Sequence, residues 1–364
     1  MRSSFLAVVL LAILGIPLLA AQNSTPLQHS LDDLALVEQA YAERQGPQAD
    51  AWRSRIKQNE PALEASLDQL IRENQGEQAL RFVDAMNFFW VEFDESQVSR
   101  QRFAEVLAMP SAAQPTALRA KVLYDAGLLA FRQNDEAASR SLNEESLAIG
   151  RRLNNKAAMA TALIGLSRVA LRDHDYATVR SDAAEALQLR QELGDASGEM
   201  SSVHMLAAAA RMEGDSASAS KYYELTLGIY GKDGNKAGVA GELFNLAFVH
   251  LHENDPDWAA RLFKESLSIY RALQSQEGLA FNVSGLAAVA AERHNGERAA
   301  RLYGALDSAM AKLGIVLDPD DALDLERYSK LAREQLSEGQ FDALRAEGRR
   351  MSVDDALALG LQSK

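Results

Sequence analysis

The stretch HENDPDWAARLFKESLSIYRAL, His252–Leu273, carries an outline that returns along the chain at a fixed spacing of forty residues. Forty residues earlier the chain reads MEGDSASASKYYELTLGIY, Met212–Tyr230, and forty before that it reads RDHDYATVRSDAAEALQLRQEL, Arg172–Leu193. A period of this length indicates a repeat architecture, in which one helical unit stacks on the next. The sequence therefore predicts a solenoid.

Four sets of residues keep this spacing, and each set has one chemical character. The sets are Asp135, Asp175, Asp215, Asp255 and Asn295; Leu147, Leu187, Leu227 and Leu267; Leu166, Leu206, Leu246 and Leu286; and Gly198, Gly238 and Gly278. Asp and Asn favour helix N-caps, and leucine at helical spacing indicates a buried face. Each unit is therefore predicted to be two helices, with the Asp or Asn capping the second.

The pattern N-L-A-x-V-x-x-x-x-x-D-x-x-x-A, followed by ESLSIYRAL, resembles the tetratricopeptide repeat in its forty-residue form. The small residues of that family fall at Gly127, Ser167, Ala207, Ala247 and Ala287, at Ser139, Ala219, Ala259 and Ala299 (Val179 departs), and at Ser146, Ala186, Thr226 and Ser266. The resemblance is strongest over 117–312. It implies an all-α, right-handed solenoid of helical hairpins, and by analogy a binding role.

The flanking segments resemble the helical tail of large bacterial ATPase-type transcription regulators. The resemblance rests on WRSRIKQNEPALEASLDQLIRENQGEQALRFVDAMNFFW upstream, and on RAARLYGALDSAMAKLGIVLDPDD and AREQLSEGQFDALRAEGRRMSVDDALAL downstream. The phosphate-binding motif G-x-x-x-x-G-K-[ST] is absent, since GIYGKDG, Gly228–Gly234, lacks both its spacing and its hydroxyl. Neither the ATPase nor the DNA-binding module of that family is present, so regulatory ATPase function is not carried over.

The N-terminus MRSSFLAVVLLAILGIPLLAAQNS has the plan of a secretory signal peptide: an early Arg2, an apolar run and a small-residue pair. We predict a signal peptide over 1–21, with an uncleaved membrane anchor as the alternative, and hence a periplasmic or extracellular chain. The predicted organisation continues with a polar linker over 22–46 and N-terminal helical pairs over 47–116. Tetratricopeptide-type repeats follow over 117–312, and a C-terminal helical cap over 313–364.

Charge and composition exclude several classes of partner and site. The formal net charge is −13, and an acidic surface repels nucleic acid and anionic lipid, so no nucleic-acid partner is predicted. The chain has no cysteine, which excludes disulfides, thiolate metal sites and a cysteine nucleophile. No membrane contact is predicted beyond the N-terminal segment.

No motif with catalytic or metal-binding spacing stands out. His250 and His252 are two residues apart on a helix and face different sides, and the acidic DPDD, Asp318–Asp321, lacks the calcium-loop pattern. The DPDD stretch is better explained as the start of a helix. We therefore predict no enzyme activity, no catalytic residue, no cofactor and no metal. A catalytic helical toroid stays as a third hypothesis, because a pair of carboxylates converging in a cleft is not visible in sequence.

A stacked array of helical hairpins presents a concave groove lined by the first helix of each repeat. The predicted partner-binding residues in this groove are Lys121, Tyr124, Arg132, Arg168, Arg172, His204, Arg211, Phe244, Asn245, Phe248, His252 and Phe281. A basic first half and an aromatic second half would suit a peptide with acidic and apolar anchors. Arg side chains paired with neighbouring Glu, and Phe side chains buried in the core, are the alternative.

Two functions follow as hypotheses. The first is an exported adaptor or scaffold that holds a protein or peptide in this groove. The second is a sensory or regulatory module that takes a small ligand there.

Overall fold

The computed structural model describes residues 25–93 and 96–362, and over these residues the chain is helical without a strand. The predicted signal segment 1–21 lies outside the described residues. The chain divides into two compact units, 1–114 and 115–364. Each unit is described by itself below.

Over its described residues, 25–93 and 96–114, the first unit has four α-helices and a 3-10 turn around an aromatic core. Its elements are α1 (Pro26–Ala42), α2 (Ala49–Arg72), α3 (Gly76–Glu92), α4 (Ser96–Leu107) and η2 (Pro110–Ala112). Helix α1 packs against α2 and α3, and α3 also contacts α4 and η2. Phe89 and Trp90 are fully buried, and the Trp90 ring meets Phe103 edge-on at a centroid distance of 6.5 Å.

The predicted polar linker over 22–46 is instead helix α1 from Pro26 to Ala42. Thr25 caps this helix, accepting a hydrogen bond from the Gln28 backbone N–H at 3.2 Å. Leu34, Val37 and Ala40 recur every three residues, so they share one face of the helix and are buried. The linker prediction gave weight to the polar, Gln-rich composition and overlooked this spaced apolar face.

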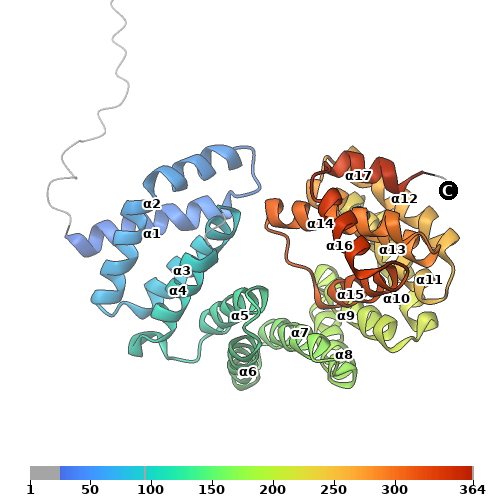
Figure 1. The fold of residues 1–364 in the computed structure, drawn as a ribbon. Helices are drawn as coiled ribbons and strands as arrows, with labels where there is room; N and C mark the ends of the chain where they lie inside the picture. The colour runs from blue at the N-terminus through green and yellow to red at the C-terminus, as the bar shows by residue number, and fades with distance from the viewer. Residues whose placement is uncertain (1–24, 94–95, 363–364) are drawn as a thin grey trace, which may run out of the picture. The chain divides into compact units, whose positions relative to one another are not determined.

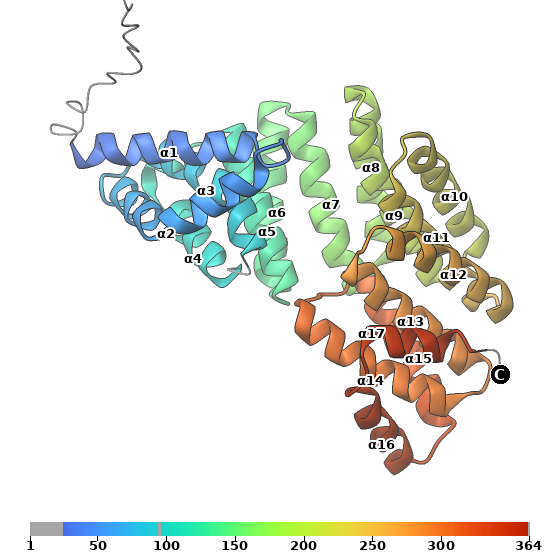
Figure 2. The ribbon, with the colours of Figure 1, turned by 90° about the horizontal axis from the view of Figure 1, so that it is seen from above.

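The second unit contains the repeat array, which Figures 1 and 2 show as helical hairpins following one another in chain order. The hairpins are α5 (Ala117–Arg132) with α6 (Glu136–Leu153), α7 (Lys156–Arg172) with α8 (Tyr176–Leu193), α9 (Ala196–Glu213) with α10 (Ser216–Lys232), α11 (Lys236–His252) with α12 (Pro256–Ala272), and α13 (Gln276–Glu292) with α14 (Gly296–Leu313). Each helix packs on its neighbours along the chain, as the forty-residue period predicts.

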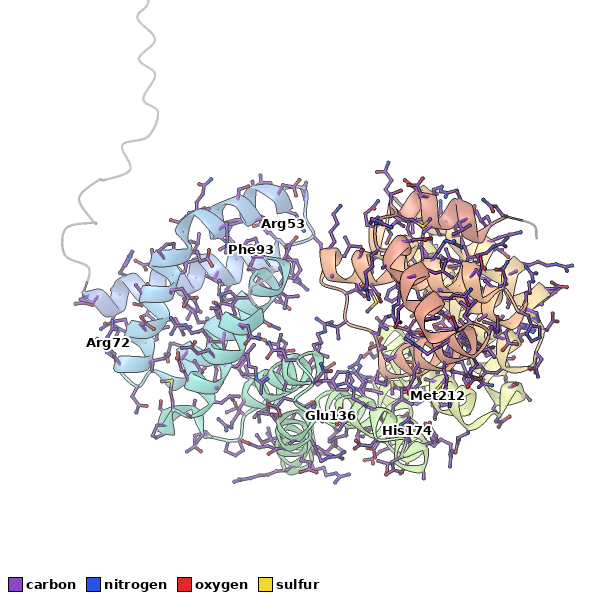
Figure 3. All side chains as sticks on the ribbon, in the orientation of Figure 1. Arg53, Arg72, Phe93, Glu136, His174 and Met212 are labelled. Atoms are coloured by element: carbon purple, nitrogen blue, oxygen red, sulfur yellow. The ribbon has the colours of Figure 1, made fainter. Side chains whose placement is uncertain are left out.

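The forty-residue Asp and Asn series performs the predicted capping. The side chains of Asp135, Asp175, Asp215, Asp255 and Asn295 each accept a hydrogen bond from the backbone N–H three residues further on. The residue before each cap adopts a positive φ, at Asn134, His174, Gly214, Asn254 and His294. Figure 3 labels His174 at one of these turns, and Glu136 just after another. Gly, Asn and His tolerate this left-handed conformation better than most residues.

Replacing Asp255 by alanine is expected to lower the free energy of unfolding by about 1 kcal/mol. The Trp258 backbone N–H, which donates to the Asp255 carboxylate at 3.0 Å, would lose its acceptor. Asp255→Asn keeps an acceptor at the same place and should change stability little. Urea denaturation followed by circular dichroism measures the difference, and equal losses in both variants would contradict a role for the cap bond.

The small residues of the repeat are buried at helix contacts, as the resemblance implies. Their exposed fractions are 1% or less for Ser139, Ser146, Ser167, Ala186, Ala207, Ala219, Thr226, Ala247, Ala259, Ser266, Ala287 and Ala299. Close packing also explains the glycines that recur every forty residues. A Cβ at Gly238 would lie 2.6 Å from the Tyr230 ring, and one at Gly278 would lie 2.2 Å from the Tyr270 ring.

The C-terminal helices are α15 (Pro319–Glu334), α16 (Glu338–Gly348) and α17 (Val353–Gly360). Helix α16 packs on α14, and α17 packs on α13 and α14, so both cover the last hairpin. Helix α15 packs on α13 and α14, and it also reaches α7, three hairpins back in the array. The segment 313–364 is therefore more than the terminal cap that was predicted.

Candidate functional site

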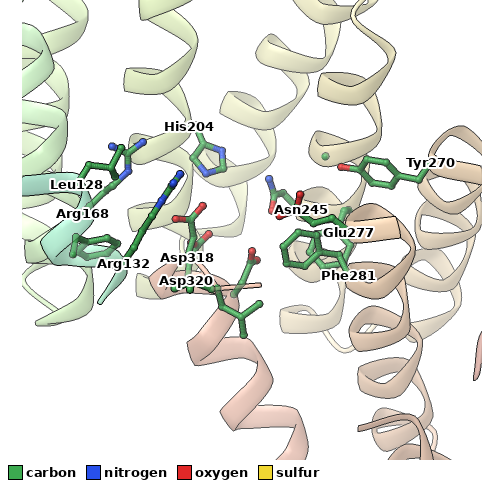
Figure 4. Close-up of a pocket in the computed structure, with 16 residues that line it drawn as sticks. Leu128, Arg132, Arg168, His204, Asn245, Tyr270, Glu277, Phe281, Asp318 and Asp320 are labelled. Atoms are coloured by element: carbon green, nitrogen blue, oxygen red, sulfur yellow. The ribbon is translucent and has the colours of Figure 1, made fainter. Parts of the chain in front are cut away.

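The inner face of the second unit is formed by the first helices of the hairpins, α5, α7, α9, α11 and α13. A pocket of about 330 Å³ lies on this face, and the beginning of α15 forms one of its walls (Figure 4). Six of the predicted groove residues line it: Arg132, Arg168, His204, Phe244, Asn245 and Phe281. The structure therefore brings together residues that are up to 149 positions apart in the sequence (281 − 132).

One side of the pocket is basic. Arg132 at the end of α5 is exposed, and its guanidinium has no hydrogen bond or ion pair among the described residues. Arg168 on α7 is half-buried, and its Nη1 donates to the Tyr124 hydroxyl at 3.2 Å. In Figure 4 the Arg132 side chain extends beside Asp318 at the start of α15, and Arg168 lies on the same side of the pocket. A guanidinium presents several donors in one plane, which suits a carboxylate.

His204 on α9 adds a third cation to this side. Its Nδ1 lies 3.8 Å from a carboxylate oxygen of Glu242, whose side chain is 6% exposed. Burial lowers the pKa of His204, but Glu242, Asp320 and Asp318 together outweigh burial and raise the pKa to about 9. The imidazole is therefore protonated at neutral pH.

The other side of the pocket is aromatic and acidic. Phe244 and Phe281 pack with ring centroids 5.9 Å apart, and Tyr270 and Glu277 lie beside them. Asp318 and Asp321 enter from the beginning of α15. The pocket thus has cations at one end and an aromatic wall with Glu277 at the other, while the α15 segment brings Asp318 next to the cations.

Further along the inner face, Arg211 is covered by α15. The Arg211 guanidinium, with 0% of its side chain exposed, forms an ion pair with Asp320 and lies 3.6 Å from Asp324 and 3.7 Å from Asp321. It also lies over the Phe248 ring, with its Cζ 5.6 Å from the centroid. Arg211 was predicted to bind an external partner, but in the structure its guanidinium is paired with carboxylates of α15 in the same chain.

Phe248 and His252 are covered by the same helix. His252 Nε2 lies 2.6 Å from an oxygen of Asp324, and its Nδ1 lies 3.3 Å from the Arg211 carbonyl oxygen. Phe248 is 3% exposed and packs against Tyr328 of α15 at a centroid distance of 6.0 Å. Helix α15 therefore fills the inner face here, and the open pocket lies beside it, where it also includes Phe244 of α11 and Phe281 of α13.

Arg172, Lys121 and Tyr124 have other surroundings. The Arg172 guanidinium stacks on the Phe131 ring at 3.8 Å and donates to the Phe131 carbonyl oxygen at 3.1 Å, so it joins neighbouring hairpins. Lys121 pairs with Asp125 at 3.2 Å, and both line a separate pocket of about 300 Å³ together with Tyr124. Arg172 thus contacts the preceding hairpin, and it does not line the 330 Å³ pocket.

The site residues that the sequence analysis missed are the carboxylates of α15. Asp320 and Asp324 are four residues apart and so share one face of that helix. This spacing was visible in the sequence, but the DPDD stretch was interpreted only as a solvated helix start. Arg211, predicted on the inner face, was the second clue: a cation that becomes buried needs a carboxylate partner, and Asp320 and Asp324 could supply one.

Two further features are absent from residues 25–93 and 96–362. No helix there is long and apolar enough to cross a bilayer. No group of three or more His, Asp or Glu side chains in that part of the chain is arranged to hold a metal ion.

Comparison with known proteins gives the class of fold. No family model and no curated protein matches the chain. Among solved structures it is similar to a Rap protein complexed with Competence and Sporulation Factor, with a TM-score of 0.53 and 10% identity over 85% of this chain and all of the other. It is similar to the apo form of RapI, with a TM-score of 0.54 and 11% identity over 84% of this chain and 97% of the other.

A Podosopora anserina structure of nearly identical kinesin-light-chain TPR-like repeats gives a TM-score of 0.45 and 14% identity, over 54% of this chain and 96% of the other. Identities this low bear on the fold alone. The two Rap structures, together with the caps, the small-residue series and the stacked hairpins, define the fold as a helical repeat of the tetratricopeptide type.

Proposed function

We propose that this protein is an exported scaffold that binds a peptide or a protein segment along its inner face, from α5 to the beginnings of α11 and α13. The observation that carries the proposal is the open part of that face. The 330 Å³ pocket adjoins a second pocket of about 190 Å³, and both are lined by Arg168, His204, Asp318 and Asp320. Successive inner helices thus offer a continuous strip of polar and apolar side chains, which suits an extended chain.

The similar Rap structure is itself a complex, with Competence and Sporulation Factor. That likeness supports a ligand-binding role for this fold, and the present chain's own pocket supports its location. The proposed function involves no catalytic step and no cofactor.

Export is proposed from the signal-like N-terminus alone. Expression of the full chain in its source cell, followed by fractionation and N-terminal sequencing of the recovered protein, tests it. A mature N-terminus near Gln22 in the periplasm or medium is the expected result. An intact Met1 in the cytoplasm would refute export and leave the binding role standing.

A pull-down with the mature chain, Gln22 to Lys364, is expected to retain a partner that the double variant Arg132→Glu, Arg168→Glu loses by at least tenfold. Reversing two cations in the pocket would repel the same carboxylates that the parent chain attracts. Partners are recovered from the source cell envelope and quantified by mass spectrometry.

Arg152→Glu is the matched control, because Arg152 is an exposed arginine on the outer helix α6. Retention of the partner by this control and by the parent, but not by the double variant, supports the groove. Equal retention by all three would place binding elsewhere.

A small-ligand role is the second candidate, and the size of the pocket favours it. A volume of about 330 Å³ lies at the lower end of the range for small-molecule sites. A metabolite panel read by thermal shift distinguishes the two roles. A ligand that raises the melting temperature of the parent but not of the Arg132→Glu, Arg168→Glu variant would favour the small-ligand role.

A further inference from the structure

The start of α15 lies in the pocket, and its Asp318 is not used in the usual way. Asp318 occupies the N-cap position of α15, yet its side chain makes no capping hydrogen bond. The other Asp N-caps of the array all accept such a bond. The Asp318 carboxylate instead lines both pockets, facing the basic side in Figure 4.

The negative charge of Asp318 favours the protonated forms of the nearby cations. Asp318 interacts electrostatically with Arg168 and contributes to the protonation of His204. Asp318 is nonetheless exposed, and no ion pair or hydrogen bond of its side chain is formed among the described residues. Its attraction to the basic side is therefore that of a nearby, solvated charge.

The connecting segment 315–318 lies at the pocket and alternates between partly buried and exposed residues. It follows Gly314, which ends α14 with a positive φ of 64°, and Val316 is 51% exposed. Directly after it, Asp320 and Asp324 fix α15 on Arg211 and His252. A segment tethered in this way stays at a high effective concentration beside the pocket.

We propose that Asp318 is a built-in competitor for a carboxylate of the bound peptide: an acidic side chain of the ligand takes its place against Arg132, Arg168 and His204. This inference rests on the proposed peptide-binding function. The ligand's neighbouring apolar side chain would then lie against Phe244 and Phe281, on the opposite wall.

The charges of the pocket favour a single carboxylate over a phosphate or a polyanion. The pocket lining contains the cations Arg132, Arg168 and His204 together with the carboxylates of Asp318, Asp321 and Glu277. Glu242 lies 3.8 Å from His204, and Asp320 is already paired with Arg211. A dianionic phosphate or a nucleic-acid backbone would meet these carboxylates with like charge. A monoanionic side chain that displaces Asp318 leaves the charge around the arginines unchanged.

Fluorescence polarisation tests the proposal with a defined probe. The probe is a fluorescein-labelled decapeptide that alternates aspartate and phenylalanine, with an isostere carrying asparagine at every aspartate. The mature chain is expected to bind the acidic probe at least tenfold more tightly than the isostere. Asp318→Asn is expected to raise affinity for the acidic probe by about two- to threefold, because it removes a nearby, solvated like charge rather than a formed ion pair.

Two further variants serve as a loss-of-binding test and as a control. Arg132→Gln with Arg168→Gln is expected to lose at least tenfold in affinity for the acidic probe, with circular dichroism confirming the fold. Glu326→Gln, an exposed neutralisation further along α15, should leave affinity unchanged. A gain of affinity in Asp318→Asn does not arise from misfolding, so the key outcome is independent of stability.

Each contrary outcome has a distinct meaning. If the arginine variant loses affinity while Asp318→Asn does not gain it, Asp318 is no competitor and the inference fails, although peptide binding in the groove stands. If acidic probe and isostere bind equally, carboxylate recognition fails as well. If neither probe binds and the envelope pull-down also retains no groove-dependent partner, the proposed function fails together with the inference.

Discussion

Replacing Arg211 by methionine is expected to lower the free energy of unfolding of the second unit by about 3–5 kcal/mol, the largest effect of any substitution considered for this chain. Methionine fills a similar volume, so the loss is electrostatic rather than a cavity. Asp320, whose side chain is 3% exposed, would remain buried without its cation, and Asp324, which is 1% exposed, would keep only its contact with His252. Carboxylates in that position must take up protons or pull α15 away from the inner face.

Urea denaturation followed by circular dichroism measures this loss. Arg180→Met is the control, because Arg180 pairs with Glu213 while 49% of its side chain is exposed, and such pairs contribute about 1 kcal/mol or less. Combining Arg211→Met with Asp320→Asn should recover part of the lost stability, since the two groups interact directly. Additive losses in that double variant would show that the ion pair is not the cause.

The second large effect concerns two neighbouring carboxylates that receive the same substitution. Asp320→Asn is expected to cost about 1.5–3 kcal/mol, because it removes the charged partner that bonds directly to Arg211. Asp321→Asn is expected to increase stability at neutral pH. Asp321 is only 3.7 Å from Arg211, but burial and the charge of Asp320 raise its pKa well above the ordinary value.

The pH dependence of the Asp321 effect follows from that raised pKa. A carboxyl whose pKa is higher in the folded than in the unfolded chain stabilises the fold when protonated. This contribution is complete below the unfolded pKa of about 3.9 and is lost as the pH rises through the folded pKa. The stability advantage of Asp321→Asn should therefore vanish below about pH 3.9 and grow toward neutral pH. An advantage that is independent of pH, or a loss at pH 7, would contradict this account.

Much of the array was predictable from the sequence because its rules are local. An N-cap such as Asp255 bonds to a backbone N–H three residues away, and Gly278 meets Tyr270 eight residues earlier. Helix α1 shows where a local rule was misapplied. Its apolar spacing was present, but the polar composition of 22–46 was given more weight.

The candidate site was only half predictable. The periodicity placed Arg132, Arg168 and His204 on the inner face, and the structure gathers them in one pocket. The same periodicity placed Arg211 and His252 there too, but it carried no information on what would lie opposite them. Arg211 and Asp320 are 109 residues apart, and α15 falls outside the repeat.

The sequence by itself determined the helical hairpins, their caps, their small contact residues and the inward face of each first helix, because these depend on residues within a few positions and on a repeated period. Only the tertiary structure decided which part of the inner face stays open. That choice depends on the docking of α15, where buried carboxylates meet a buried arginine. The docking of α15 is governed by the pairing of charges that become neighbours only once the array has formed.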